Sequence, residues 1–207
     1  IIFVSGILEQ DISLSRVEDD VVFSFSGSSD QITIEEIFLS EFKEIEAFRF
    51  DSGVVWDMDD VRNKTISDGK TTGDDLIVGF HDHDDTLDGG LGNDTLQGNG
   101  GSDTYISDVG YGHDVFRDNI KLVGEPSNDV VSFGSGITTS EIEIEQVGDD
   151  LVFSFASAND SLTIEDHFKS TGFHVVEEFH FDDGTIWTSA DVQDILDGSS
   201  SGGLTIT

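Results

Sequence analysis

The sequence predicts an all-β protein, and three observations support this fold class. A nine-residue pattern rich in glycine and aspartate repeats in the middle of the chain, runs of alternating apolar and polar residues lie on both sides of it, and the two flanking stretches are copies of one another. Alternation with a period of two is typical of a strand with one buried face. We therefore expect a flanking module at 1–66, the repeats at 67–118, a second flanking module at 119–197 and a Gly/Ser-rich tail at 198–207.

The central repeat is clearest in residues 89–97, which read Gly-Gly-Leu-Gly-Asn-Asp-Thr-Leu-Gln and follow the pattern Gly-Gly-x-Gly-x-Asp-x-apolar-x. The pattern returns in degraded form before and after this stretch, with one or two extra residues in some steps. Its aspartates are Asp75, Asp85, Asp94, Asp103 and Asp114. Each is followed two positions later by an apolar residue, which we expect to face the interior: Ile77, Leu87, Leu96, Tyr105 and Phe116.

This spacing suits calcium, a hard cation that takes roughly 6–8 oxygen ligands from carboxylates and backbone carbonyls. Glycine lets the backbone adopt positive φ and approach an ion closely. Two nine-residue units make one coil, so loops about 18 residues apart stack on the same edge. We therefore pair Asp75 with Asp94 and Asp85 with Asp103. The alternative is a flexible Gly/Asp-rich linker, which has no need for an apolar residue at a fixed place after each aspartate.

The composition points to a protein that cations complete. The 207 residues include 44 Asp and Glu against 9 Lys and Arg, a formal net charge of −35. Such a surface disfavours nucleic acid and anionic membrane as partners. There is no cysteine, so no disulfide framework is possible. No apolar run reaches the roughly 18 residues of a transmembrane helix, no signal peptide opens the chain, and the start at Ile1 inside an apolar run leads us to expect a fragment of something longer.

The two flanking modules are an internal duplication. Residues 1–40 align with 131–170, so that Phe23 corresponds to Phe153 (153 − 23 = 130), and residues 41–61 align with 172–192 after one extra residue near Thr171. The matched segments include Phe-Ser-Phe, Thr-Ile-Glu and an aromatic stretch that ends in tryptophan. Their counterparts are Phe23–Phe25 with Phe153–Phe155, Thr33–Glu35 with Thr163–Glu165, and Phe48, Phe50, Asp51, Gly53 and Trp56 with Phe179, Phe181, Asp182, Gly184 and Trp187.

Each flanking module is predicted to form short strands. Ile142 and Ile144 alternate with glutamates, and residues 151–155 alternate in the same way. Turns are expected at Asp19-Asp20, at 148–150 and at 182–184. A short helix is predicted over 189–196, with Ser189 as N-cap and Val192, Ile195 and Leu196 on one face, and a weaker one near 58–63. The 16 phenylalanines and two tryptophans are read as core, the alternative being an aromatic ligand-binding face such as a sugar platform.

With both features in view, residues 73–116 resemble the RTX (repeats-in-toxin) β-roll of type I-secreted bacterial proteins. The stretch from Ser102 to Tyr105 followed by Gly110 to Asp114 resembles the usual exit from such a roll. The flanking modules resemble the haemolysin-type calcium-binding-related module that follows RTX repeats in toxin-like and adhesin-like proteins. Together these resemblances cover most of residues 1–197.

The resemblance implies a short right-handed parallel β-roll with Ca²⁺ held between stacked loops, capped by two β-rich modules that each end in a short helix. Roughly three to five ions are expected, given one site per stacked pair of loops. Asp94 and Asp103 would each bridge ions on both sides of their loop, and His83, which replaces a glycine, puts the first site of its edge in doubt. The expected metal-binding residues are Asp75, Asp85, Asp94, Asp103, Asp114, Gly73, Gly89, Gly90, Leu91, Gly92, Gly98, Asn99, Gly100, Gly101 and Gly112.

The resemblance also implies a non-enzymatic block of a secreted toxin or adhesin that stays unfolded at cytosolic calcium and folds outside the cell. Physical chemistry supports this, because binding energy at a site that folding creates is folding energy, and extracellular calcium modules bind at roughly 10⁻⁴–10⁻³ M. Expected partners are calcium, adjacent RTX blocks of the same parent chain, and a possible cell-surface or glycan target. The alternatives are a calcium-dependent module for glycans, ice or a receptor, and the appendage of a secreted protease, lipase or epimerase.

Other chemistry is disfavoured by the sequence. Gly198-Ser199-Ser200-Ser201-Gly202 fits Gly-x-Ser-x-Gly but lies in a Gly/Ser-rich tail without a strand before it. An EF-hand beginning at Asp84 would carry Thr95 where the twelfth-position glutamate belongs. His81 and His83 lack a nearby third histidine or cysteine for a transition metal, so they are read as solvated loop residues. No catalytic residue is predicted.

Overall fold

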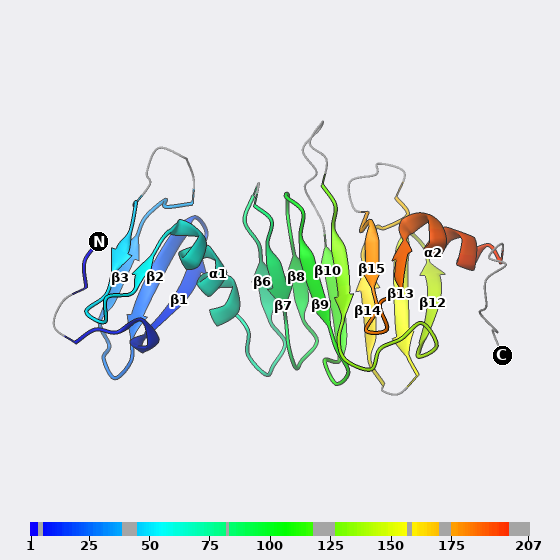
Figure 1. Ribbon diagram of the computed structural model, residues 1–207, viewed down its shortest axis with the longest axis horizontal. Coiled ribbons are helices and arrows are strands. Elements are labelled where there is room, and N and C mark those ends of the chain that lie inside the picture. Colours follow the sequence, from blue (N-terminus) through cyan, green and yellow to red (C-terminus); the bar gives the residue numbers. More distant parts are fainter. Residues whose placement is uncertain are drawn as a thin grey trace. The chain divides into compact units, whose positions relative to one another are not determined.

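The computed structural model of the chain describes residues 1–3, 6–38, 45–81, 83–117, 127–156, 159–169 and 175–198. Their regular elements are mostly strands, with two α-helices and a short 3-10 helix among them, so the β-rich prediction is confirmed (Figure 1). The chain divides into two compact units, residues 1–69 (unit 1) and 70–207 (unit 2). Most of the predicted tail lies outside the described residues. Among the described residues, no helix has the length and apolar content needed to span a membrane.

Unit 1 contains a three-stranded antiparallel sheet in chain order. Its strands are β1 (Ile12–Val17), β2 (Asp20–Phe25) and β3 (Gln31–Ile34), preceded by the 3-10 helix η1 (Glu9–Asp11). A second pair, β4 (Phe48–Arg49) and β5 (Val55–Trp56), forms a hairpin. The turn between β1 and β2 falls where the acidic pair predicted it, with Glu18 at φ +55°. The turn between β4 and β5 uses Gly53 at φ +90°, a conformation that glycine adopts without steric cost.

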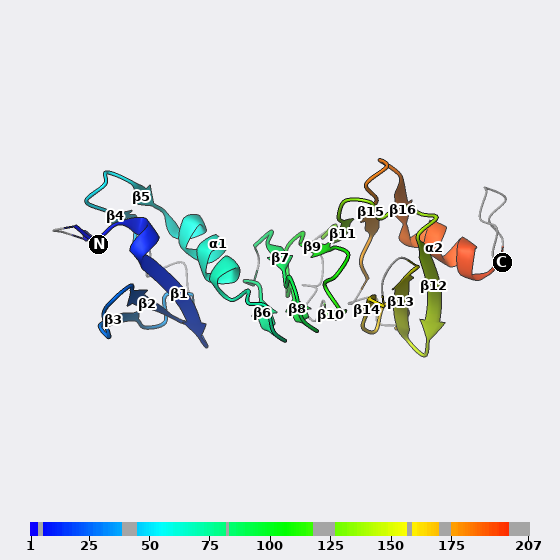
Figure 2. The same cartoon turned by 90° about the horizontal axis from the view of Figure 1, so that it is seen from below.

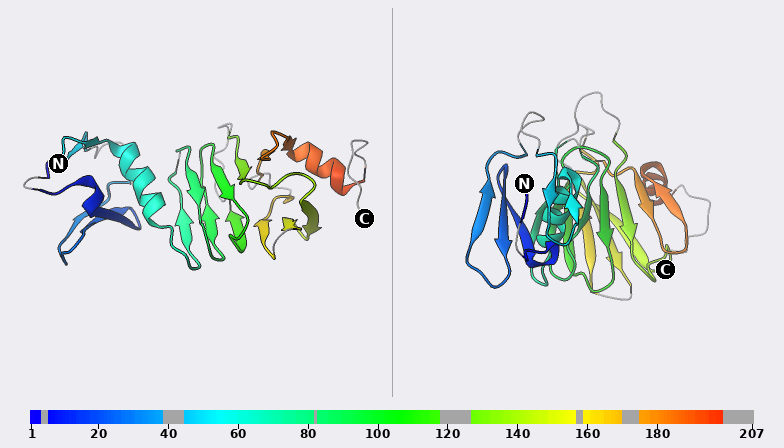
Figure 3. Two further views of the ribbon diagram at one scale, coloured as in Figure 1. Left: turned by 60° about the horizontal axis from the view of Figure 1, so that its bottom comes forward. Right: turned by 60° about the vertical axis from the view of Figure 1, so that its left-hand side comes forward.

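Helix α1 (Met58–Asp68) closes unit 1 and is longer than the segment predicted near 58–63. It begins with a capping box in which Asp57 accepts from the Asp60 backbone N–H, while the Asp60 carboxylate accepts from the Asp57 N–H, both at 3.0 Å. It continues past residue 63 because Thr65 and Ile66 are buried, in addition to Val61. The helix packs against β1, and the Asp68 carboxylate accepts from the Leu14 backbone N–H at 2.7 Å (Figure 3).

Aromatic rings fill the core of unit 1, as expected from the composition. The Phe3 and Phe50 rings stack with centroids 5.0 Å apart, and Phe23 stacks on Phe48 at 5.2 Å. Offset stacks and edge contacts of this kind add to the apolar burial. The buried members of this core are Phe3, Ile12, Leu14, Val21, Phe23, Ile37, Phe48, Phe50 and Val61.

The central segment of unit 2 sends successive strands to two sheets in alternation. The strands are β6 (Leu76–Val78), β7 (Thr86–Asp88), β8 (Thr95–Gln97), β9 (Thr104–Ser107) and β10 (His113–Arg117). β6, β8 and β10 pair in parallel in one sheet, and β7 pairs in parallel with β9 in the other. Figure 2 shows these strands as two rows. The register aligns Ile77, Leu96 and Phe116, and all five apolar residues predicted to face inward are buried.

The second flanking module joins both sheets of the central segment. Its strands are β11 (Val130–Phe133), β12 (Ile142–Val147), β13 (Asp150–Phe155), β14 (Ser161–Ile164), β15 (Glu178–His180) and β16 (Ile186–Thr188). β14 pairs in parallel with β10, and β11 pairs in parallel with β9. The remaining pairs of this module are antiparallel except β11 with β15, so both large sheets are mixed.

Helix α2 (Ser189–Leu196) matches the predicted range, but the predicted cap was wrong. The N-cap is Thr188, because its hydroxyl accepts from the Asp191 backbone N–H and the Asp191 carboxylate accepts from the Thr188 N–H at 2.8 Å. Ser189 lies one residue inside the helix and uses its hydroxyl differently, donating to the Val176 carbonyl at 2.7 Å. Of the predicted apolar face, Val192 is buried while Ile195 and Leu196 are partly buried.

Candidate metal centre

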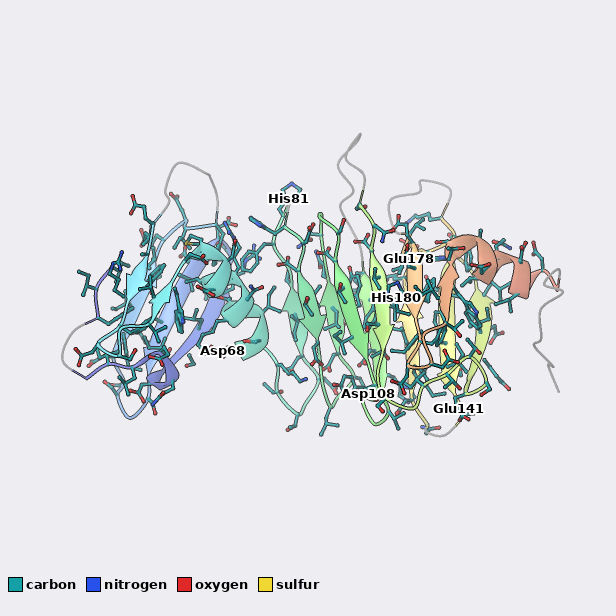
Figure 4. All side chains as sticks on the ribbon, in the orientation of Figure 1. Asp68, His81, Asp108, Glu141, Glu178 and His180 are labelled. Carbon is teal, nitrogen blue, oxygen red and sulfur yellow. The ribbon has the colours of Figure 1, made fainter. Side chains whose placement is uncertain are left out.

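The repeat loops of unit 2 form two edges at opposite ends of the strands. The Asp94 edge consists of residues 73–75, 89–94 and 110–114, and the Asp103 edge consists of residues 79–81, 83–85, 98–103 and 127–129. In Figure 4, His81 in a loop of the Asp103 edge and Asp108, just ahead of the last loop of the Asp94 edge, lie at opposite ends of the strands. The alternation of strands between two sheets produces this arrangement, because each turn of the chain passes one edge and then the other.

The Asp94 edge holds a ladder of carboxylates in consecutive coils. The Asp75 backbone N–H donates to Asp94 Oδ1 at 2.8 Å, and the Asp94 N–H donates to Asp114 Oδ1 at 2.9 Å. Backbone carbonyls of the same residues also link neighbouring coils: the Thr95 N–H donates to the Asp75 carbonyl at 2.8 Å. The structure therefore brings Asp75 next to Asp94, as the spacing predicted, and adds Asp114 as the next member.

The Asp103 edge holds a second ladder of the same kind. The Asp85 N–H donates to Asp103 Oδ1 at 2.9 Å, which places the second predicted pair together. The Asp103 N–H in turn donates to Asp129 Oδ1 at 2.8 Å, and the Asp129 N–H donates to Glu177 Oε2 at 2.8 Å. The ladder thus runs beyond the nonapeptide repeats into the second flanking module.

Each ladder contains one carboxylate oxygen that is buried without a hydrogen-bond partner. These atoms are Asp94 Oδ2 and Asp103 Oδ2. Asp94 is 1% exposed and Asp103 is fully buried. A buried polar atom without a partner costs about 1–3 kcal/mol, and more when it is charged. Because the partner oxygens Oδ1 already accept backbone N–H groups, the free Oδ2 atoms are the natural positions for a cation.

Burial and mutual repulsion disfavour the charged form of these carboxylates in the absence of a cation. The pKa of Asp103 is raised to about 7, chiefly by burial; the Asp129 and Asp85 carboxylates contribute to the rise, and the hydrogen bond from the Asp85 N–H opposes it. Burial likewise raises the pKa of Asp114 to about 7, with the Asp94 carboxylate adding to it. The pKa of Asp94 is raised for the same reasons. A divalent cation favours the charged form of nearby carboxylates and would offset these penalties.

Glycines make room for the close approach of neighbouring loops. A Cβ on Gly92 would collide with the Gly73 carbonyl, and a Cβ on Gly101 would collide with the His83 carbonyl. Both glycines also hold positive φ, +140° and +130°, which L side chains rarely adopt. Stacked loops of this kind bring backbone carbonyls of adjacent coils toward one another, as calcium coordination by carbonyl oxygens requires.

The remaining predicted ligands lie in the same loops. Gly89 and Gly98 pass directly beside the Asp94 and Asp103 carboxylates, where a Cβ would collide with the unpartnered oxygens. Asn99 takes a glycine-like φ of +77° and donates from Nδ2 to the Gly79 carbonyl at 2.9 Å. Gly90 and Leu91 lie on the Asp94 edge, as do Gly73 and Gly112, while Gly100 lies on the Asp103 edge. Their role as ligands stays a prediction.

The loop with His83 carries an extra residue, as the ten-residue step from Asp75 to Asp85 predicted. Gly79 aligns with Gly98, since the Gly79 N–H donates to the Gln97 carbonyl just as the Gly98 N–H donates to that of Arg117. From Gly79 to Asp85 is therefore one residue longer than from Gly98 to Asp103. The His83 backbone N–H still donates to the Gly100 carbonyl at 3.1 Å, so the coil closes despite the missing glycine.

Side chains alone would not complete a metal site at either edge. Among the residues that the structure describes, no three His, Asp or Glu side chains converge as a metal cluster. Calcium at these edges would need carboxylates together with backbone carbonyls, which is a donor set that calcium accepts. The residues present fit that requirement, because each edge combines a free carboxylate oxygen with glycine-rich loops.

Two features of the site escaped sequence reasoning. Asp129 and Glu177 belong to the Asp103 edge, and each is followed two residues later by a buried residue, Val131 and Phe179. That Asp-x-apolar or Glu-x-apolar spacing was the available signal, but only the first of the three pattern glycines precedes each residue, as Gly124 and Gly172. The second feature is Lys70, whose Nζ lies 2.6 Å from Asp88 Oδ2 beside the Asp94 edge and so neutralises part of its charge.

The aromatic residues that the structure describes form no exposed face. Every described Phe, Tyr and Trp side chain is buried or partly buried. Trp187 is 9% exposed and packs edge-on against Phe181 with ring centroids 4.8 Å apart. Trp56 is partly buried and makes the same contact with Phe50 at 4.5 Å. The tryptophans therefore serve the cores of the two flanking modules.

Comparison with known proteins connects this chain to calcium binding. The family model described as haemolysin-type calcium binding protein related domain matches residues 20–60 and 150–191, one segment in each flanking module. The chain is also similar to the iron-regulated protein FrpA of Neisseria meningitidis serogroup C, with 31% identity over 101 residues. That match covers 48% of this chain and 9% of FrpA, so the chain corresponds to a small part of that relative. Both findings support a relationship to an RTX-like calcium-binding family.

Proposed function

We propose that unit 2 contains a calcium-binding β-roll and that the chain is a structural, non-enzymatic block of a secreted toxin or adhesin, folded by calcium outside the cell. The observation that carries the proposal is the pair of buried, unpartnered oxygens, Asp94 Oδ2 and Asp103 Oδ2, one on each edge. The family match of both flanking modules supports calcium as the cation.

In this proposal Asp94 and Asp103 hold the ions together with backbone carbonyls of their own and adjacent loops. The carbonyls are those of Gly89 to Gly92 on one edge and of Gly98 to Gly101 on the other. When bound, calcium supplies positive charge between coils whose carboxylates otherwise repel. The chain contributes the rest: the glycines allow the loops to stack, and the buried residues Leu96 and Tyr105 hold the strands in register.

Folding by calcium follows from the charge balance. With 44 acidic and 9 basic residues, the chain repels itself in the compact state. Binding energy at a site that exists only in the folded chain adds to the stability of the fold. Affinity in the range of extracellular modules, roughly 10⁻⁴–10⁻³ M, would leave the roll open inside a cell and closed outside it.

Far-UV circular dichroism during a calcium titration tests the proposal. In EDTA, the natural chain should lack part of the circular dichroism signal of β-structure. It should gain that part cooperatively as calcium reaches millimolar concentration. The double variant Asp94→Asn with Asp103→Asn should need about tenfold more calcium or more, because each edge loses a charged ligand. The matched control is Asp149→Asn with Asp194→Asn, two exposed aspartates of unit 2, which should titrate like the natural chain. An identical signal in EDTA and in calcium contradicts the proposal.

The recognition role for glycans, ice or a receptor gains no support from the described residues. It depends on a solvent-facing aromatic row, and no described aromatic side chain is exposed. The proposal therefore keeps the structural role.

A further inference from the structure

The third strand of each flanking module has a different environment in the two copies. In unit 2, β14 lies between β13 and β10, and its Leu162 is fully buried. In unit 1, the counterpart β3 pairs with β2 and no described strand lies on its other side (Figure 1). Ile32, which corresponds to Leu162, is 39% exposed. The same sequence position is therefore interior in one copy and surface in the other.

The neighbouring sheet edge shows the same difference. Residues 1–3 of unit 1 occupy the place of β11, because the Ile1 amino group donates to the Ala47 carbonyl at 2.8 Å and Ile2 forms a parallel bridge with Arg49. In unit 2, β11 has β15 on one side and β9 on the other. In unit 1, no described strand takes the place of β9, and Ile2 is 70% exposed.

A glutamate at this edge also has a different environment in the two copies. Glu46 of unit 1 aligns with Glu177, whose Oε2 accepts from the buried Asp129 N–H at 2.8 Å. Glu46 is exposed. Two backbone N–H groups also reach the central segment in unit 2: those of Ser161 and Glu165 donate to the carbonyls of Gly112 and Phe116. Their counterparts in unit 1 are Gln31, the first residue of β3, and Glu35, the residue after it.

We infer that this open edge of unit 1, formed by residues 1–3, β3 and Glu46, is a docking surface for the last coil of a glycine- and aspartate-rich roll. The inference rests on the proposed function. In the second copy, β9 and β10 each add a parallel strand to one sheet, and the Asp129 N–H donates to Glu177. The partner of unit 1 should likewise provide two parallel strands, one for each sheet, and an aspartate whose N–H reaches Glu46. A single strand from a second copy would cover β3 and leave residues 1–3 and Glu46 without a partner, so a roll coil fits the whole edge better.

The test adds such a coil in natural register. A second copy of residues 70–130 is fused directly before Ile1 of the full chain, which reproduces the junction of Val130 with Val131 because Ile1 corresponds to Val131. Hydrogen exchange read by mass spectrometry follows the amides of β3 in calcium. In the fusion these amides should exchange slower by about tenfold or more than in the natural chain, approaching those of β14. The amides of β2 report that unit 1 is folded in both.

Two variants of the fusion make the result specific. Asp94→Asn with Asp103→Asn in the added segment alone should abolish the extra protection of β3. Ile32→Glu should also abolish the extra protection of β3 in the fusion. In the natural chain the same substitution should leave the exchange of the β2 amides unchanged, because Ile32 is already partly exposed there.

The possible failures are distinguishable. If the added segment is protected in calcium while β3 exchanges as before, the docking inference is overturned and the proposed function stands. If neither the added nor the resident repeats gain protection in calcium, both are overturned. If β3 is already protected in the natural chain and sedimentation shows a dimer, a second copy occupies the edge and the inference is overturned.

Discussion

The two flanking modules have the same strand order, yet one is completed by its neighbours and the other is not. In the second copy, β11 and β14 continue the two sheets of the central segment, and Leu162 is fully buried. In the first copy, β3 ends its sheet among the described residues, and Ile32 is 39% exposed. Each module's sequence therefore encodes its own strands, whereas the adjoining segment of the chain determines which strand edge is buried.

One buried position is apolar in the first copy and polar in the second. Ile37 of the first copy is buried at 5% exposure, and its counterpart is His167, buried at 4%. His167 Nδ1 is buried without a hydrogen-bond partner, and the ring packs edge-on against Phe168 and Phe179. Burial lowers the pKa of His167 to about 4, so the ring is neutral in the fold. The second copy thus carries an unsatisfied polar atom that the first copy lacks.

The largest expected difference between the copies is their response to a chelator. EDTA should remove hydrogen-exchange protection from β11 and β14, because their partners β9 and β10 belong to the calcium-dependent segment. Protection of β2 should change little, since its partners β1 and β3 belong to unit 1. Exchange of peptides covering 20–25, 130–133 and 150–164, with and without calcium, measures this. Equal loss in both copies would contradict the prediction.

An intermediate effect is expected from exchanging the core residues. His167→Ile should raise the free energy of unfolding by about 1–3 kcal/mol at neutral pH, because it removes a buried atom without a partner. Ile37→His should lower it by a similar amount. Chemical denaturation in saturating calcium measures both. A destabilised His167→Ile protein would mean that the ring makes an interaction that isoleucine cannot replace.

The gain from His167→Ile should also depend on pH. The folded pKa of about 4 lies below the usual 6.5, so the unfolded chain binds the extra proton between these values. The natural protein therefore loses stability as pH falls from 6.5 to 4, and the isoleucine variant lacks this contribution to the loss. The difference between the two should grow over this interval and be smallest above pH 7. A constant difference would show that His167 does not titrate in this way.

The smallest expected effect concerns the first hairpin turn of each copy. Glu18 holds φ +55° where the second copy has Gly148 at +69°. A left-handed conformation costs a residue with a Cβ about 1–2 kcal/mol, so Glu18→Gly should stabilise unit 1 by about 1 kcal/mol or less after the extra entropy of glycine in the unfolded chain. Gly148→Glu should destabilise unit 2 by about 1 kcal/mol. Denaturation midpoints of the two variants measure both effects. A stabilised Glu18→Gly protein together with a destabilised Gly148→Glu protein would support the equivalence of the two turns.

Much of the strand pattern could be predicted from local spacing. The residue two positions after each repeat aspartate is buried, as Leu87, Leu96 and Tyr105 illustrate, because a strand with one buried face alternates its side chains. The helix over 189–196 was predicted from a cap residue and an apolar face at helical spacing, although its cap is Thr188 rather than Ser189. Cap identity depends on which backbone donor a hydroxyl reaches, and two adjacent hydroxyl residues do not reveal this in sequence.

The candidate site could be predicted only as far as the nonapeptide step extends. The pairs Asp75 with Asp94 and Asp85 with Asp103 follow from repeats of nearly constant length. Asp129 lies 26 residues after Asp103, and Glu177 lies 48 residues after Asp129, so no fixed step leads to them. Their place in the ladder results from sheet pairing between distant segments, which a local pattern does not encode.

Spacing and composition are enough to reveal the repeats, the duplication, the acidic charge and the residues that face the interior. The three-dimensional arrangement was needed to find which carboxylate oxygens are buried without a partner, how far each ladder extends, and which copy of the flanking module has an open edge among the described residues. The physical reason is that hydrogen bonds between strands and the desolvation of carboxylates depend on neighbours far away in the chain. Two copies of one module therefore have different environments at the same positions.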